Sequence, residues 1–348
     1  MTKSNESKPS DVFEDKKKKA NQLVKEGNFT EAIPEYQSLI EMNPEYAAGY
    51  SNLGLIYLQQ GNHELAKQYL FQSIQKKPEL LEGYFNLGVL YQDENAFEKA
   101  LTFYKEVVTR DKQDGVTFLR MGYCALGMDN KEDARAFFEE SFRLQPNSLE
   151  AGAALASIYI NLNRLEDAEE VLRVNLISYP EELSLHYSLG LVLRQQNKIE
   201  KALAHFKRVV NLDENYAQGF FYLGDCCLKL DFWDQAEAFL SKAFKLDQSS
   251  HDAVYLLGTL YENRKQTDKM ILAYQQWVEM LIQQSIHTDP EYYDTFQSVC
   301  GKLIDHFSQL GEMEKSDYYR KFTSNYNSSS HETEDHPDDF NISLTIDD

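Results

Sequence analysis

The sequence predicts an all-α protein made of stacked helical hairpins, and two series of small residues carry that prediction. A small residue recurs every 34 residues, and a second series, of alanine, runs in the same phase. Equal spacing without insertions is typical of a chain in which one structural unit is repeated. The first series comprises Ala20, Gly54, Gly88, Gly122, Ala156, Gly190, Gly224 and Gly258, and the second comprises Ala32, Ala66, Ala100, Ala134, Ala168, Ala202 and Ala236, with Met270 in the eighth place.

Each 34-residue unit is expected to form two amphipathic helices joined by a turn. In residues 47–80, apolar residues at helical spacing fill two segments on either side of Gly61-Asn62, and the second segment ends before Pro78. Two helices interlock closely only where no bulky side chain holds them apart. The recurring small residues therefore indicate where the two helices of each unit meet.

The residues between the small positions follow a known pattern. Residues 81–114 carry Tyr84, Leu87, Gly88, Tyr91, Ala100 and Tyr104, and residues 115–148 carry Phe118, Met121, Gly122, Ala134, Phe138 and Pro146 at the same offsets. On these residues the chain resembles the tetratricopeptide-repeat family. That resemblance implies a right-handed α-α superhelical solenoid in which the first helix of each unit lines a concave wall.

The repeat pattern and the composition divide the chain into four parts. Residues 13–284 hold eight units, and residues 285–326 keep helical spacing without the small-residue series, which predicts a degenerate helix pair that caps the last unit. Residues 1–12 and 327–348 are polar and charged, so we expect a disordered N-terminal tail and an acidic disordered C-terminal tail. Within the latter, Phe340–Ile346 alternates apolar and polar residues, a pattern that can fold on a partner or in this chain's own groove.

Charge and hydropathy exclude several partners and locations. The formal net charge of −21 opposes binding to nucleic-acid phosphates or to anionic lipid. The start of the chain, Met1 to Lys19, is polar and lysine-rich and lacks the apolar segment of a secretory signal. No apolar run is long enough to cross a bilayer. We expect a soluble, cytoplasmic protein without nucleic-acid partners or membrane insertion.

No pattern in the sequence indicates catalysis, a cofactor or a metal. His63-Glu64 lacks the second histidine of a zinc-protease helix, and no glycine-rich phosphate loop follows a strand. The histidines, among them His186, His205 and His306, are scattered. The cysteines lack ligand spacing and are expected to be small core residues: Cys124, Cys226, Cys227 and Cys300. We therefore expect a protein that is not an enzyme and has no cofactor or metal site.

The candidate binding residues are those first-helix positions that, in the family, face the concave wall. They combine rings with amide and guanidinium groups, which suits an extended peptide because the polar groups bond its backbone while the rings contact its side chains. The alternative is that the rings pack between consecutive first helices and that the polar groups are solvated. The candidates are Asn21, Asn52, Phe85, Asn86, Arg120, Tyr123, Tyr187, Arg194, Phe221, Tyr222 and Tyr255.

Two narrower resemblances meet only part of their patterns. Cochaperones of this family clamp a C-terminal carboxylate with Lys and Asn of one unit, Asn of the next, and Lys and Arg of a third. Lys17, Asn21 and Asn52 match the first three places, but Glu82 and Asn86 stand where the two cations belong, so a carboxylate would lose its charge-assisted bonds. The repeat region of O-linked N-acetylglucosamine transferase has a series of asparagines on its inner wall. Asn52 and Asn86 match that series, and other residues occupy its later positions in this chain.

The expected function is that of a non-catalytic scaffold that binds extended peptide or protein segments in its concave groove. Two alternatives stay open. One is a structural scaffold that associates with its own copies, and the other is a regulatory or adaptor subunit of an enzyme complex.

Overall fold

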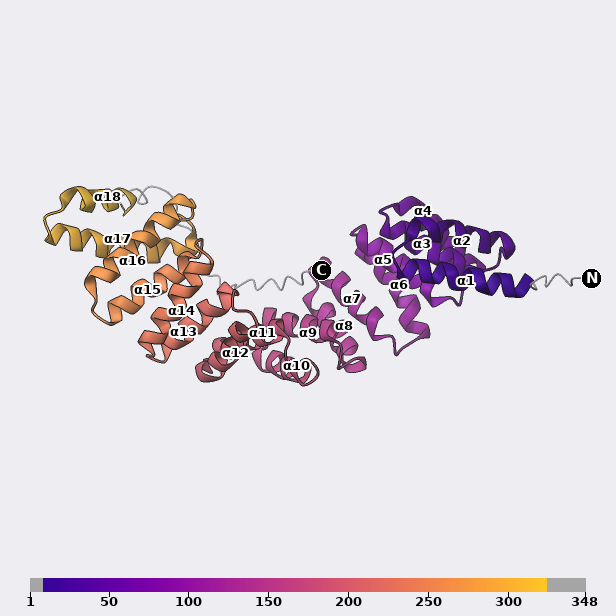
Figure 1. The fold of residues 1–348 in the computed structure, drawn as a ribbon, viewed down its shortest axis with the longest axis horizontal. Coiled ribbons are helices and arrows are strands. Elements are labelled where there is room, and N and C mark those ends of the chain that lie inside the picture. The colour runs from indigo at the N-terminus through magenta and orange to yellow at the C-terminus, as the bar shows by residue number, and fades with distance from the viewer. Residues whose placement is uncertain (1–8, 324–348) are drawn as a thin grey trace, which may run out of the picture. The chain divides into compact units, whose positions relative to one another are not determined.

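The protein consists of helices and their connections throughout residues 9–323, the part that the structure, a computed structural model, describes (Figure 1). Residues 1–8 and 324–348 lie outside the described residues. The predicted acidic tail, with Phe340–Ile346, therefore lies outside them too.

The described chain forms two compact units, and the boundary between them, at Ile158 and Tyr159, falls inside α9 (Leu149–Asn161). The first unit contains α1 (Pro9–Lys25), α2 (Phe29–Met42), α3 (Ala47–Gln59), α4 (His63–Lys76), α5 (Leu81–Asp93), α6 (Phe97–Arg110), α7 (Gly115–Gly127) and α8 (Lys131–Leu144). The second contains α10 (Leu165–Ser178), α11 (Leu183–Gln195), α12 (Ile199–Leu212), α13 (Ala217–Lys229), α14 (Trp233–Leu246), α15 (His251–Asn263), α16 (Thr267–Gln283), α17 (Pro290–Gln309) and α18 (Met313–Thr323).

The helices keep the period of the sequence. From α3 to α15, each first helix begins 34 residues after the preceding one, and the second helices from α4 to α16 do the same. The predicted all-α class and its helical-hairpin repeats are confirmed.

The N-terminal boundary differs from the prediction, because α1 begins at Pro9 and residues 9–12 are helical rather than part of a disordered tail. Proline suits the first turn of a helix, since its φ angle is already helical and its missing N–H would have no partner there. The ring of Phe13 also contacts Tyr46 edge to face, with centroids 5.2 Å apart. This contact holds the first turns of α1 against the next hairpin.

The glycine series marks the closest approach of the two helices in a hairpin. A Cβ atom on Gly88 would lie 2.4 Å from the Tyr104 ring, and one on Gly122 would lie 2.3 Å from the Phe138 ring. In each case the opposing side chain comes 16 residues after the glycine. The same offset joins Gly54 to Leu70, Gly190 to Phe206, Gly224 to Leu240 and Gly258 to Tyr274.

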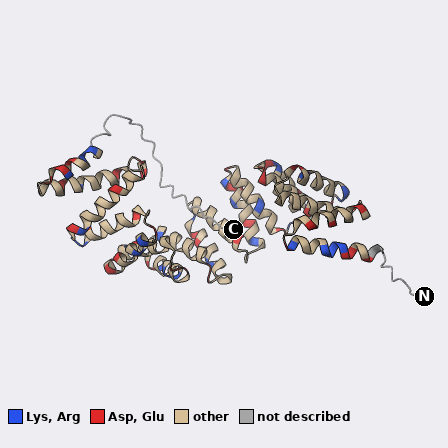
Figure 2. Ribbon diagram, turned by 45° about the horizontal axis from the view of Figure 1, so that its top comes forward, with Lys and Arg blue, Asp and Glu red and all other residues tan. Residues whose placement is uncertain are grey.

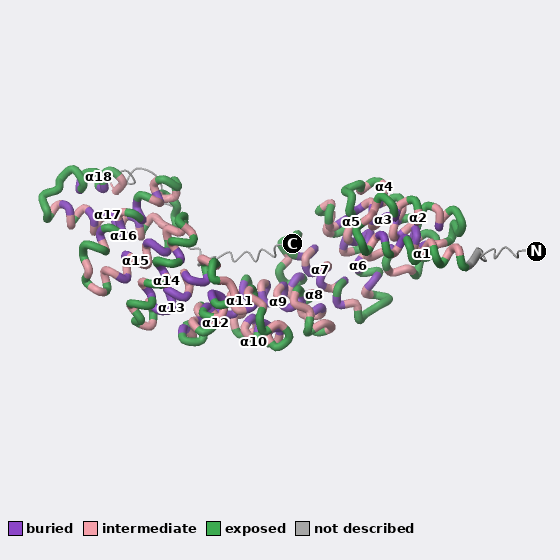
Figure 3. Tube along the Cα trace, viewed as in Figure 1, coloured by how far each residue is buried: buried purple, intermediate pink, exposed green. Residues whose placement is uncertain are grey.

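The alanine series lies on the opposite side of the same contact. All seven alanines, from Ala32 to Ala236, are completely buried. Buried positions recur along the helices of both units, and exposed positions gather at the turns and on the outward faces (Figure 3). Within each hairpin, small residues of one helix therefore interlock with large residues of the other, and this arrangement repeats along the unit.

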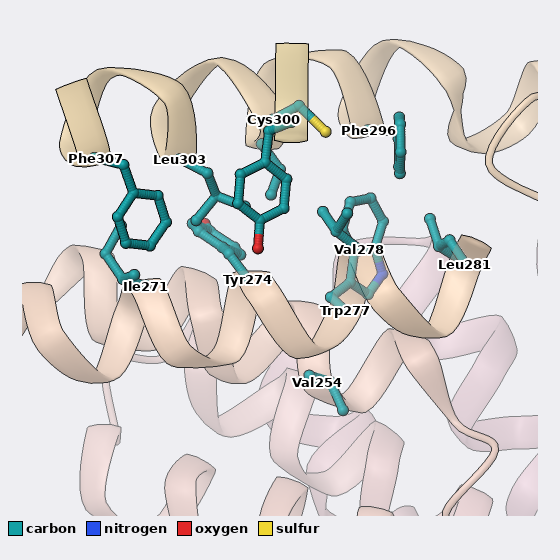
Figure 4. Close-up of a cluster of buried hydrophobic side chains, with 12 residues drawn as sticks. Val254, Ile271, Tyr274, Trp277, Val278, Leu281, Phe296, Cys300, Leu303 and Phe307 are labelled. Atoms are coloured by element: carbon teal, nitrogen blue, oxygen red, sulfur yellow. The ribbon is translucent and has the colours of Figure 1, made fainter. Parts of the chain in front are cut away.

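The second unit ends in a core of larger side chains between α16 and α17. Figure 4 shows Trp277, Val278 and Leu281 of α16 directed toward α17, and Phe296, Cys300 and Leu303 of α17 directed toward α16. All of these side chains are buried. The helix pair after the eighth repeat thus covers apolar residues that the repeat itself leaves open.

Candidate functional site

The first unit contains an open cavity of about 680 Å³ on its first-helix side. Its walls come from α1, α3 and α5, from Val107 of α6, and from the connection that leads into α7 with Val116 at the start of that helix. Four of the predicted site residues line it, namely Asn21, Asn52, Phe85 and Asn86. The other lining residues are Lys17, Tyr46, Ala48, Ser51, Leu55, Leu80, Leu81, Glu82, Val107, Asp111, Asp114 and Val116.

Two of the cavity's asparagines are held by bonds within the unit. The hydroxyl of Tyr36 donates a hydrogen bond to Asn21 Oδ1 at 2.6 Å, and burial raises the pKa of Tyr36 to about 12, so the donor stays protonated. Asn86 Nδ2 donates to Ser51 Oγ at 3.1 Å, and Asn86 is only 8% exposed. These bonds fix the orientation of both amides, and Asn86 has little surface left for a partner.

Phe85 and Leu55 supply the apolar part of the wall. Both are half-buried and both line the cavity. The Phe85 ring lies 5.7 Å from the Tyr104 ring of α6, so one face of Phe85 packs inside the unit. The part that stays exposed is a fixed apolar surface beside polar groups.

The two predicted residues on α7 lie outside this cavity. Tyr123 packs edge to face on Phe138, with centroids 5.3 Å apart, and burial raises its pKa to about 12 beside Glu150. Arg120 is half-buried, and its Nε atom has no hydrogen-bond partner in the described chain. The structure therefore separates Arg120 and Tyr123 from the other four candidates of the first unit.

In the second unit the candidates Tyr187 and Arg194 both contact the candidate Tyr222. The rings of Tyr187 and Tyr222 lie 5.8 Å apart, and the Arg194 guanidinium lies 5.4 Å from the Tyr222 ring. Arg194 Nε donates to Asp225 Oδ2 at 2.5 Å, and Asp225 is only 4% exposed. Burial raises the pKa of both tyrosines. The rings of Tyr187 and Tyr222 and the guanidinium of Arg194 therefore already make contacts within the unit, which leaves less of them for a partner.

A smaller cavity, of about 270 Å³, lies between the N-terminal ends of α13 and α15. The candidates Phe221 and Tyr222 line it, together with Ala217, Gln218, Ala243, Asp247, Ser249, Ser250, His251 and Asp252. Tyr255 does not line it, because its ring packs against those of Tyr274 and Trp277, at 6.2 and 5.1 Å.

Sequence reasoning missed one polar pair in the second unit. His186 of α11 and His205 of α12 appeared scattered, yet their Nδ1 atoms lie 2.9 Å apart, and burial lowers the pKa of His205 to about 4. The two histidines are 19 residues apart and so lie on the first and second helices of one hairpin. This spacing is the only feature of the sequence from which their contact could have been predicted. No group of three or more His, Cys, Asp or Glu side chains within residues 9–323 is arranged to hold a metal.

The cysteines lie where the sequence predicted. All four are free thiols and buried, and burial raises the pKa of Cys226 and of Cys300 to about 12. A thiol with so high a pKa stays protonated and unreactive. No helix in the described part of the chain is long and apolar enough to span a membrane.

Comparison with known proteins identifies the repeat. Sequence models of the TPR repeat match residues 20–61 and 190–231, and models of the tetratricopeptide repeat match residues 47–79, 81–114 and 125–187. Together the matches cover more than half of the chain. The chain belongs to the tetratricopeptide-repeat family. Two of these matches begin at the first residues of α3 and α5 and end just after α4 and α6, so these two tetratricopeptide repeats coincide with helical hairpins.

Individual relatives of this tetratricopeptide-repeat chain are distant. It is 23% identical over 185 residues to the human protein O-mannosyl-transferase TMTC3, a match that covers 49% of the chain and 20% of the relative. It is 25% identical over 267 residues to the BBSome complex member BBS4 homolog of Drosophila melanogaster, covering 63% of the chain and 54% of the relative. The chain thus spans about a fifth of the first relative and about half of the second.

One solved structure similar to the chain is a tetratricopeptide repeat protein from Parabacteroides merdae. The two share 18% identity with a TM-score of 0.47, over 71% of this chain and 98% of that protein.

Proposed function

We propose that this tetratricopeptide-repeat protein is a non-catalytic interaction scaffold that binds an extended segment of another protein in the cavity of its first unit. The observation that carries the proposal is the open cavity of about 680 Å³, which three successive first helices line with apolar and amide side chains. A cavity of this size suits several consecutive residues of a peptide.

The wall is already ordered, which favours binding. Tyr36 orients Asn21, so this amide need not lose conformational freedom when a segment binds, and the buried Asn86 and Ser51 are fixed by their mutual hydrogen bond. Leu55 and Phe85 offer apolar surface beside them. Because ordering the site costs binding free energy, a wall that is ordered beforehand keeps more of that free energy for affinity.

The relatives agree with an interaction role. The matched BBS4 homolog is named as a member of a complex. The mannosyl-transferase match spans only a fifth of that enzyme, so we do not extend its activity to this chain. Four buried free thiols suit a reducing compartment, and we include a cytoplasmic location in the proposal.

A selection from a random 12-residue peptide library on the full chain tests the proposal. Enriched peptides are then measured against two double variants. The cavity variant is Leu55→Gln with Val116→Gln, and the matched control is Phe71→Gln with Leu126→Gln. Val116 lines the cavity and is 41% exposed, whereas Phe71 and Leu126 lie elsewhere in the same unit and are 40% and 38% exposed.

We expect the cavity variant to weaken peptide binding about tenfold, which corresponds to the loss of about 1.4 kcal/mol of apolar contact, and the control to leave it unchanged. Circular dichroism checks that both variants keep their helices. Failure to enrich any peptide, or equal binding to both double variants, would overturn the proposal. Enrichment of peptides from the chain's own sequence, with a concentration-dependent mass, would favour self-association instead.

A further inference from the structure

The cavity of the first unit has an unequal set of charges. Three carboxylates line it, those of Glu82, Asp111 and Asp114, whereas Lys17 is the one cation on its wall in the described chain. The apolar walls concentrate the field of these charges, because apolar atoms screen it less than water does. The charge that a bound segment meets therefore depends on which of these groups already have partners.

Lys17 of the cavity wall and two neighbouring lysines of α1 are already paired. Lys17 Nζ lies 3.2 Å from Glu14 Oε2 on the same helix. Lys19 Nζ and Lys16 Nζ lie 2.6 and 3.4 Å from the carboxylate of Glu35 on α2, and the hydrogen bond from Lys19 lowers the pKa of Glu35. The blue stretch next to the marked N-terminus in Figure 2 is this lysine run. Three of the four lysines in this run are therefore paired with carboxylates of α1 and α2.

The carboxylates of the cavity lack such compensation. Asp114 accepts hydrogen bonds from Thr117 N and Thr117 Oγ1, at 3.0 and 2.7 Å, and Asp111 accepts one from Gln113 N at 2.9 Å. These neutral donors orient the two carboxylates and leave their charge in place. Glu82, exposed in the first turn of α5, has no side-chain partner within the described residues.

We propose, on the basis of the function proposed above, that the segment bound in this cavity is basic: it places Lys or Arg side chains against Glu82, Asp111 and Asp114 and its apolar side chains against Leu55 and Phe85. A segment that ends in a carboxylate meets the opposite situation, because Glu82, Asp111 and Asp114 repel its negative charge. The uncompensated carboxylates thus select the sign of the partner's charge, which the shape of the cavity alone does not.

The chain offers a matched pair of substitutions for the test. Glu82 and Glu98 are both exposed and each is the second residue of its helix, α5 and α6, so a lysine has the same unfavourable interaction with the helix dipole at either place. Only Glu82 lines the cavity. The peptides enriched from the random library are measured by fluorescence anisotropy against the wild-type chain and the variants Glu82→Gln, Glu82→Lys and Glu98→Lys.

We expect Lys and Arg to be enriched in the selected peptides. Their affinity should fall stepwise from wild type to Glu82→Gln to Glu82→Lys, by about tenfold in total, and stay within about twofold for Glu98→Lys. Added salt should weaken wild-type binding more than binding to Glu82→Lys.

The outcomes separate this inference from the function on which it rests. One outcome is that the selected peptides lose affinity for the Leu55→Gln, Val116→Gln variant and yet show no excess of Lys and Arg, or no response to Glu82→Lys. That result would overturn the basic character of the partner and would still support binding in the cavity. Enrichment of Asp and Glu would do the same. Peptides that bind the Leu55→Gln, Val116→Gln variant as tightly as the wild type would overturn both.

Discussion

At the scale of single residues, the glycines of this chain differ in what surrounds them. Gly88 lies in α5 with the Tyr104 ring where a Cβ atom would be, whereas Gly301 lies in α17 with no atom within 4 Å of that position. Both are helical, so both carry the entropic cost of glycine in a helix. They therefore separate the effect of packing from that of helix propensity.

Gly88→Ala is expected to lower the free energy of unfolding by about 1–3 kcal/mol, because the new methyl group forces Tyr104 or the helices apart. Gly301→Ala is expected to raise it by about 0.5–1 kcal/mol, because alanine favours the helix and meets no obstacle. Urea unfolding followed by circular dichroism measures both. If both substitutions changed the free energy of unfolding in the same direction, the contact between Gly88 and Tyr104 would not limit the size of residue 88.

The candidate site shows how far sequence reasoning reaches at this scale. The 34-residue period places Tyr187, Arg194 and Tyr222 at equivalent first-helix positions, but it does not say which of them a neighbour uses. Arg194 binds Asp225, 31 residues later, and that pair depends on the side chains of two consecutive first helices. The periodic pattern predicts which first-helix positions lie on the concave wall. How exposed a side chain is at such a position depends on the particular residues around it.

At the scale of the helical hairpin, the turn between the two helices repeats as regularly as the helices do. One residue with a positive φ angle follows each first helix at the same place in every repeat, and a positive φ ends a helix because it reverses the local twist. The series comprises Gly27, Gly61, Asn95, Asp129, Asn163, Asn197, Asp231 and Lys265. Sequence analysis identified this turn only at Gly61, and in the repeats after it Asn, Asp and Lys replace glycine.

Lys265 is the least suited member of that series. Its φ is 56°, a conformation that costs an ordinary side chain about 1 kcal/mol and that Asn and Asp adopt more readily. Lys265 is exposed, so its side chain offers little compensation. We expect Lys265→Gly to raise the free energy of unfolding by about 0.5–1 kcal/mol and Lys265→Ala to leave it nearly unchanged, because alanine keeps the Cβ atom. Thermal unfolding measures both, and an equal gain for alanine would contradict the explanation.

At the scale of the whole molecule, a repeat protein must cover the apolar face of its last repeat. In the second unit α17 and α18 lie over the side chains of α16, and Phe296, Leu303 and Phe307 are buried there. Sequence analysis predicted a degenerate pair at this place because the small-residue series stops. It could not identify the contacts, since they join large aromatic residues that follow no repeat pattern. We propose that this pair is the C-terminal cap of the unit.

Removal of residues 285–348 tests that cap. The deletion would expose Trp277, Val278 and Leu281, each of which is at most 1% exposed in the intact unit. Each large apolar side chain that becomes exposed costs about 1.5–3 kcal/mol. We expect the truncated chain to unfold at lower urea concentration and to associate in static light scattering, because an uncovered repeat offers its apolar face to another copy.

Removal of residues 324–348 alone is the matched control, since it takes away the acidic tail and leaves α17 and α18 in place. Its unfolding midpoint and its state of association should equal those of the full chain. If the shorter deletion already caused association, the solubility of the protein would depend on the charge of the tail rather than on the cap. If the longer deletion stayed monomeric with an unchanged midpoint, α16 would be stable without its cover, and the large aromatic residues between α16 and α17 would require another explanation.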